Sequence, residues 1–234
     1  MHRLLLPAAC CATLALCATA AHASPARPDY VRIVGNQTFR QGFTPELIVL
    51  HVTTDPHGTK VVRDQPGTKD LARLGAYFDD PRTEVSSHVA NDAEGNDARY
   101  VRDRRKAWTQ VAFNPVSLSI EQIGSTAYRR RNWLVNRLPQ LEDTARWIAH
   151  WHRKWGIPIR RAEVSGASVV EPGVATHRQL GRPGGDHSDP GPNYPFAYVL
   201  RLARSYASPG RAPSPAAPRP CRPRPALKCS RDAR

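Results

Sequence analysis

A continuous apolar run at residues 46–53, with the sequence ELIVLHVT, constrains the fold of this chain more than any other feature. Apolar residues without polar alternation, over the length of one strand, are typical of a central strand that is buried on both faces. We therefore expect it to lie inside a sheet. The run carries a histidine, His51, near its end. Ligand sites in open α/β sheets gather at the carboxyl ends of strands, so His51 is a candidate site residue.

Strand and helix patterns alternate along the rest of the body. Apolar residues at intervals of three and four predict a long helix over 132–155, in which Pro139 either kinks the helix or marks its true start. The other expected elements are helices at 68–78 and 195–205, a hairpin formed by 86–91 and 99–102, and strands at 117–123 and 173–177. Interleaved strands and helices predict an α/β fold: a single domain, residues 29–206, with a central mixed β-sheet flanked by helices.

The first 23 residues have the order of a secretory signal peptide. A short basic start precedes an apolar run from residue 4 to about residue 20, and small residues lead to a cleavage site that we place after Ala23. A membrane anchor is the alternative, but the run is short and contains Pro7. A lipoprotein site at Cys17 is a further alternative. We expect export to the cell wall or the periplasm.

Residues 207–234 form a segment rich in proline, arginine and alanine, with no apolar period that could build a core. We interpret it as a disordered basic tail. Cys221 and Cys229 are the only cysteines left after signal cleavage, and whether they form a disulfide stays open. The net charge of +14 favours a polyanionic partner, either nucleic acid or anionic wall polymers. Nucleic-acid motifs are absent from the sequence and export is expected, so we predict wall polymers and no nucleic acid.

A loop at residues 176–196 places metal-type ligands among glycines and prolines. His177 ends the predicted strand before it, and His187 and Asp189 are two positions apart, so an extended chain would point both to one side. A hydrolytic zinc site needs three ligands from His, Asp or Glu and an open position for water. His51, His177 and Asp189 supply that set, whereas Asp186 is interpreted as a turn residue. Each histidine alone would be read as structural.

A carboxylate also stands in the middle of an apolar strand. In the strand at 117–123, Glu121 lies on the face opposite Ile120. A surface position is the plain interpretation of Glu121. The alternative is a role in the chemistry of the neighbouring site.

The order of these motifs resembles one enzyme family, the zinc-dependent N-acetylmuramoyl-L-alanine amidases of the type 2 group, which are related to peptidoglycan recognition proteins and phage lysozyme-type amidases. The resemblance covers residues 44–202. It is carried by Leu47–His51, Val85–His88, Ala107–Trp108, Asn114 with Ser119–Glu121, Thr176–Leu180 and His187–Pro195.

The resemblance implies hydrolysis of the amide bond between N-acetylmuramic acid and L-alanine in peptidoglycan by a monomeric enzyme. It implies one Zn²⁺ on His51, His177 and Asp189, Glu121 as the base, and His187 as the group that polarises the carbonyl. His88, Trp108 and Asn114 are expected to support the ligands or bind substrate. The alternative is a peptidoglycan-binding module without catalysis, against which the third ligand, Asp189, argues.

Two positions depart from the family pattern. Some relatives have a catalytic tyrosine where this chain has Ser87, and relatives often have a histidine where it has Thr109. The division of labour among the catalytic groups is therefore left open by the sequence.

Overall fold

The computed structural model describes residues 28–53 and 69–208. The predicted signal peptide, all five cysteines and all but the first two residues of the predicted tail lie outside the described residues. No helix in the described part is long and apolar enough to cross a membrane.

The expected central sheet is present and is mixed. Its strand order is β1-β5-β4-β7-β3-β10, and every neighbouring pair is parallel except β4 with β5. The strands are β1 (Tyr30–Val31), β5 (Asp97–Arg99), β4 (Val89–Asn91), β7 (Ser117–Ile123), β3 (Leu47–Thr53) and β10 (Gly173–Thr176). The α/β prediction is confirmed, with the apolar run as a central strand and the predicted hairpin as β4 and β5.

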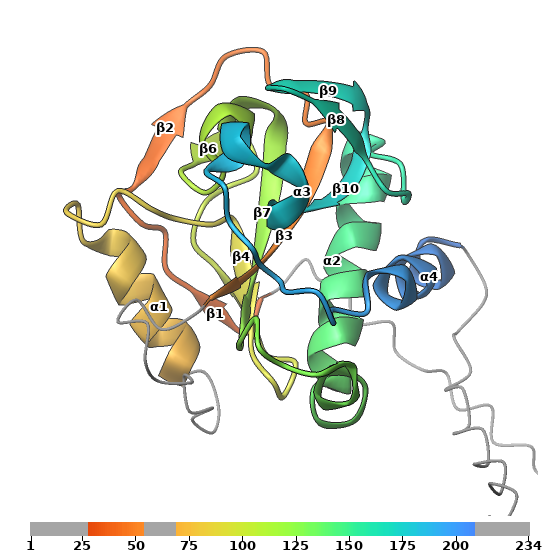
Figure 1. The fold of residues 1–234 in the computed structure, drawn as a ribbon. Helices are drawn as coiled ribbons and strands as arrows, with labels where there is room; N and C mark the ends of the chain where they lie inside the picture. Colours follow the sequence, from red (N-terminus) through yellow and green to blue (C-terminus); the bar gives the residue numbers. More distant parts are fainter. Residues whose placement is uncertain (1–27, 54–68, 209–234) are drawn as a thin grey trace, which may run out of the picture.

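Helices α2 (Leu138–Trp155) and α4 (Phe196–Ala207) lie side by side over one face of the sheet (Figure 1). Alternate residues of β3 and β7 point into this layer, where Ile48, Leu50, Leu118 and Ile120 pack in one core with Trp147 and Trp151. Pro139 is the second residue of α2, so it marks the start of the helix and does not kink it. A short π-helix, η2 (Asn132–Asn136), precedes it.

The opposite face is covered by α1 (Lys69–Asp79), the 3₁₀-helix η1 (Val111–Val116) and the short α3 (His177–Leu180). Leu71 and Phe78 of α1 pack with Ala90 and Ile123, while Phe113 of η1 and Leu180 of α3 pack with strand residues on the β3 and β10 side. These strand residues include Leu47 and Val49. Because successive side chains of a strand alternate in direction, His51 projects from the same face of β3 as these two residues.

Two small antiparallel sheets of two strands each lie outside the central sheet. They pair β2 (Gln37–Phe39) with β6 (Arg105–Ala107) and β8 (Glu163–Ser165) with β9 (Ser168–Glu171), and a 3₁₀ turn, η3 (Arg182–Gly184), lies in the ligand loop. The register of the central sheet sets up the site. His51 on β3 pairs with Glu121 on β7, and Thr176, just before His177, pairs with Leu50.

Candidate active site

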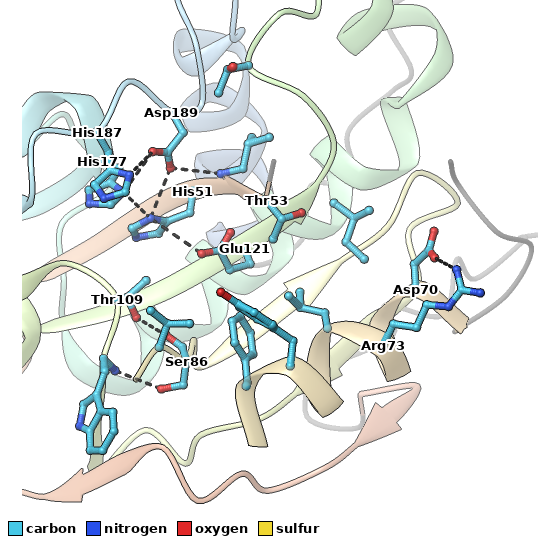
Figure 2. Close-up of a pocket in the computed structure, with 18 of the residues that line it drawn as sticks. His51, Thr53, Asp70, Arg73, Ser86, Thr109, Glu121, His177, His187 and Asp189 are labelled. Carbon is cyan, nitrogen blue, oxygen red and sulfur yellow. Dashed lines mark hydrogen bonds and ion pairs between the residues drawn. The ribbon is translucent and has the colours of Figure 1, made fainter. Parts of the chain in front are cut away.

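His51, His177 and Asp189 meet at the carboxyl ends of β3 and β10 (Figure 2). The Nδ1 atoms of the two histidines are 3.0 Å apart. Asp189 places Oδ1 3.1 Å from Nδ1 of His177 and Oδ2 3.4 Å from Nδ1 of His51. All three residues are buried, with exposed fractions of 2%, 3% and 7%. The structure thus brings together residues that are 126 and 12 positions apart in the chain.

The loop between His177 and Asp189 folds back on itself, which brings Asp189 next to the two histidines. The backbone N–H of Arg178 donates to the carbonyl of Asp189 at 2.9 Å, and the N–H of Val52 donates to Oδ2 of Asp189 at 3.3 Å. Asp186 is a turn residue, with φ of 58° and its N–H donating to the carbonyl of Gly181. Gly191 has φ of 93°, and a Cβ there would come within 2.2 Å of the carbonyl oxygen of Thr126, so only glycine fits.

The donor atoms of the three residues suit a divalent metal ion. Nε2 of His177 lies 2.8 Å from the carbonyl of Gly184 and can only donate to it, which leaves Nδ1 of a neutral His177 with a free lone pair. Burial and His177 lower the pKa of His51 to about 4, so His51 is neutral at pH 7. Burial acts to raise the pKa of Asp189, but its close contacts with His177 and His51 outweigh burial and hold that pKa well below the usual range. Two imidazole nitrogens and a carboxylate therefore converge where a cation would satisfy them.

Glu121 lies beside this cluster. Its Oε1 is 4.0 Å from Nδ1 of His51, and only 13% of its side chain is exposed. Burial, and then the charge of Asp189, raise the pKa of Glu121 well above its ordinary value. A carboxylate with a raised pKa is a stronger base than an exposed one, and it can hold the proton that it accepts. The plain interpretation of Glu121 as a surface residue is wrong.

His187 forms the outer side of the cluster. Its ring stacks on that of His177, with centroids 4.2 Å apart and planes 13° from parallel, and its Nδ1 is 3.9 Å from Oδ1 of Asp189. The side chain is 60% exposed, so it can reach a ligand that the buried residues cannot.

A cavity of about 580 Å³ opens onto these residues. His51, His177, His187, Asp189 and Glu121 line one end, and α1 lines the other with Asp70, Arg73, Leu74, Tyr77 and Phe78. Figure 2 shows Asp70 and Arg73 on the opposite side of the pocket from the cluster. Sequence analysis did not identify these α1 residues as part of the site, because the helical pattern does not reveal where the helix docks.

The three residues expected to support the ligands or bind substrate lie in different places. Trp108 lines the cavity. His88 is buried and does not line it, with Nδ1 3.0 Å from Oγ of Ser119 and a pKa that burial lowers to about 3. Asn114 shapes the adjacent loop, since its Oδ1 accepts hydrogen bonds from the backbone N–H groups of Thr109 and Gln110.

The two residues that depart from the family pattern, Ser87 and Thr109, lie in different environments. Ser87 is fully buried, and its hydroxyl donates to the carbonyl of Val89 and bonds to Ser119. It therefore does not replace a catalytic side chain. Thr109 lines the cavity, and its hydroxyl donates to the carbonyl of Ser86 at 2.6 Å.

Comparison with known families identifies the domain. A family model described as N-acetylmuramoyl-L-alanine amidase (Amidase_2) matches residues 41–192, which is more than half of the chain. The chain belongs to this family. It is an amidase that hydrolyses the amide bond between N-acetylmuramic acid and L-alanine in peptidoglycan. No curated protein matches it at a significant level.

Solved structures support the fold of this amidase. AmpD is 18% identical with a TM-score of 0.53, and the match covers 74% of this chain and 93% of AmpD. The Staphylococcus aureus hydrolase AmiA is 17% identical with a TM-score of 0.52, and coverage is 76% and 82%. Drosophila PGRP-LB is 17% identical with a TM-score of 0.51, and coverage is 72% and 86%. At these identities the likeness establishes a common fold.

Proposed function

We propose that this amidase is a zinc enzyme that acts outside the cytoplasm, with His51, His177 and Asp189 as the ligands and Glu121 and His187 as the catalytic groups. The observation that carries the proposal is the convergence of two imidazole nitrogens and a carboxylate beside a buried glutamate, at one end of a cavity. Zinc bound there would supply a Lewis acid, which lowers the pKa of a water and polarises a carbonyl.

Glu121 accepts the proton of the attacking water. Its raised pKa suits this role, and its register position beside His51 holds it next to the ligand cluster. As the C–N bond breaks, the protonated Glu121 delivers that proton to the nitrogen of L-alanine, so that the products are a lactyl carboxylate on the glycan and a free amine on the stem peptide.

His187 acts on the carbonyl oxygen of the scissile amide. Its exposed ring is held against His177 at the outer side of the cluster, where an N–H group can donate to the oxygen as negative charge develops on it.

The stem peptide extends along the cavity toward α1. Arg73 is the only lysine or arginine among the cavity-lining residues that the structure describes, and it lies across the pocket from the ligand cluster. Its side chain is 72% exposed, and its contact with Asp70 is long, at 3.5 Å. We assign Arg73 to a carboxylate of the stem peptide, because a guanidinium can pair with a carboxylate through two hydrogen bonds.

The predicted signal peptide supports a site of action in the cell wall or periplasm, and the basic tail supports attraction to anionic wall polymers. Deleting residues 209–234 should weaken binding to isolated walls at low salt and leave turnover of a soluble muropeptide unchanged. Equal wall binding by the full chain and the truncated chain at low salt would contradict the role of the tail.

Metal analysis combined with mass spectrometry of a digest tests the zinc proposal. Purified protein should contain one zinc per chain, and digestion of peptidoglycan should release stem peptides with a free L-alanine amino group. Protein that contains no divalent metal, and takes up none when zinc is supplied, would overturn the proposal.

A further inference from the structure

The two histidine ligands differ in how their second ring nitrogen is held. His177 directs Nδ1 to the cluster and donates from Nε2 to the carbonyl of Gly184 at 2.8 Å. Metal-binding histidines almost always donate their other N–H to such an acceptor, which fixes both the tautomer and the ring orientation. His177 already has this support within the fold.

His51 also directs Nδ1 to the cluster, and its Nε2 points elsewhere into the protein. That Nε2 is buried, and no hydrogen bond to it is formed within the described residues. Because buried polar groups are nearly always paired, this nitrogen indicates an acceptor close by. The acceptor must lie on the face of β3 that carries Leu47, Val49 and His51.

Gln110 lies at this face. It immediately precedes η1, whose Phe113 packs in one core with Leu47 and Val49. Gln110 is 1% exposed, and it is close enough to the imidazole of His51 to act on its pKa, raising it against the effect of burial.

The amide of Gln110 also has an unpaired atom. Nε2 of Gln110 donates to Oγ of Ser117, whereas Oε1 is buried and accepts no hydrogen bond within the described part of the chain. A buried donor on His51 and a buried acceptor on Gln110 thus both lack a partner, and one bond between them would satisfy both.

We propose that Oε1 of Gln110 accepts a hydrogen bond from the Nε2–H of His51 and thereby holds His51 with an unprotonated Nδ1 facing the ligand cluster. Gln110 is a positioning residue, because it acts on the reaction only through His51. The loop around it is built to hold it in place, since Oδ1 of Asn114 accepts the backbone N–H of Gln110 at 2.7 Å. This inference rests on the proposed metal site for its effect on zinc.

The first experiment measures zinc affinity by competition with a chromophoric chelator. Gln110→Leu removes the acceptor and should weaken zinc binding by about 10- to 100-fold. Gln110→Glu keeps an oxygen acceptor and should bind zinc more tightly than Gln110→Leu. Gln140→Leu is the matched control, because Gln140 is a buried glutamine on α2 that bonds to the carbonyls of Asn91 and Ile123, on the side of the sheet away from the cluster. A natively folded Gln110→Leu protein with unchanged zinc affinity would overturn the proposal.

The second experiment needs no variant and separates the two proposals. Nitrogen-15 NMR of the wild-type imidazoles should show a proton on Nε2 of His51, both in the metal-free and in the zinc-loaded protein. The absence of a proton on Nε2 of His51 in the metal-free protein would overturn the role of Gln110. Failure of the wild-type protein to bind zinc would instead overturn the metal site, and the metal-free spectrum would still decide the hydrogen bond.

Discussion

Glu121 and His51 face each other across the β7–β3 ladder, with Oε1 of Glu121 4.0 Å from Nδ1 of His51. A shift of one position in the pairing would turn either side chain to the opposite face, toward α2 and α4. The strand register therefore decides whether the ligand cluster has a base beside it. The side chains on the two faces of β3 pack in two different cores, and a shift would exchange them, so packing on both faces fixes that register.

The role of Glu121 predicts a large loss of activity without loss of metal. Glu121→Gln keeps the size of the side chain but cannot accept the proton of the attacking water. General base catalysis typically contributes about 10²- to 10⁴-fold, so kcat/KM on a soluble muropeptide should fall within that range. Zinc content should stay at the wild-type value, since Glu121 is not among the proposed ligands.

Glu142→Gln provides the comparison for Glu121→Gln, because it makes the same chemical change on α2, on the other side of the sheet. It should leave kcat/KM unchanged. If Glu121→Gln kept more than about half of the activity, Glu121 would have no part in the mechanism.

Loss of a ligand should remove zinc and activity together. His177→Ala leaves His51 and Asp189 as an incomplete set, so we expect zinc content and turnover both to fall to background. Chelation of the wild-type protein should have the same effect on activity, and added zinc should restore it. At zinc concentrations about 100 times Kd, binding should stabilise the fold by about 2.7 kcal/mol, which thermal unfolding would detect.

His152→Ala controls for the loss of an imidazole, because His152 lies on α2 and its ring bonds to the carbonyl of Ile157. It should keep zinc and activity. Full activity in metal-free wild-type protein, or stoichiometric zinc in His177→Ala, would contradict the assignment of the ligands.

A buried acidic pair on the α2 side predicts how stability depends on pH. Burial, and then the charge of Asp97, raise the pKa of Asp143 to about 7, and burial raises the pKa of Asp97 to about 6. Both values lie above the ordinary value of 3.8, so the folded state holds these protons more tightly than the unfolded state. Their stabilising contribution is complete below about pH 4 and is lost as the pH rises through 6 to 7.

Asp143→Asn should remove part of this pH dependence. The amide keeps an oxygen that accepts the hydrogen bond of Asn91, which the carboxylate accepts at 3.0 Å, but it has no proton to lose. Thermal unfolding at pH 5 and pH 8 should show a smaller fall in Tm for this variant than for wild type. Each pKa unit of the shift that is removed corresponds to about 1.4 kcal/mol in the free energy of unfolding. Glu142→Gln, one position away, should show the same fall in Tm between pH 5 and pH 8 as wild type. If Tm fell between pH 5 and pH 8 by the same amount in Asp143→Asn as in wild type, Asp143 would not be a source of the pH dependence.

Much of the fold follows from local patterns. The continuous apolar run of β3 and the period of α2 each specify an element. In the Pro/Gly-rich loop Asp189 lies in a turn, whereas His177, predicted to end a strand, is the first residue of the short helix α3. Short strands such as β1 and β2 were not predicted, because two or three residues carry no measurable alternation. Their pairing is also distant in sequence, as in Tyr30 with Ala98.

Some residues of the site could be predicted from the sequence and others could not. His51, His177 and Asp189 could be identified because metal-type residues at strand ends are unusual. Arg73 and Gln110 could not, because an arginine on a helix and a glutamine in a loop are ordinary in sequence. Only the docking of α1 against the cavity and the burial of the Gln110 amide give these two residues a role.

Arg73 predicts that substrate preference depends on a carboxylate of the stem peptide. Arg73→Gln removes the charge and keeps a polar side chain, and a hydrogen bond to a charged group at an exposed position should be worth about five- to tenfold in KM. The rise should appear for a muropeptide with a free carboxylate on its second residue and should be absent for the same muropeptide amidated there, with kcat little changed for both. Lys69→Gln removes an exposed charge from the same helix without touching the cavity, so it should alter neither KM. An equal rise in KM for the two substrates would mean that Arg73 shapes the pocket and does not read the carboxylate.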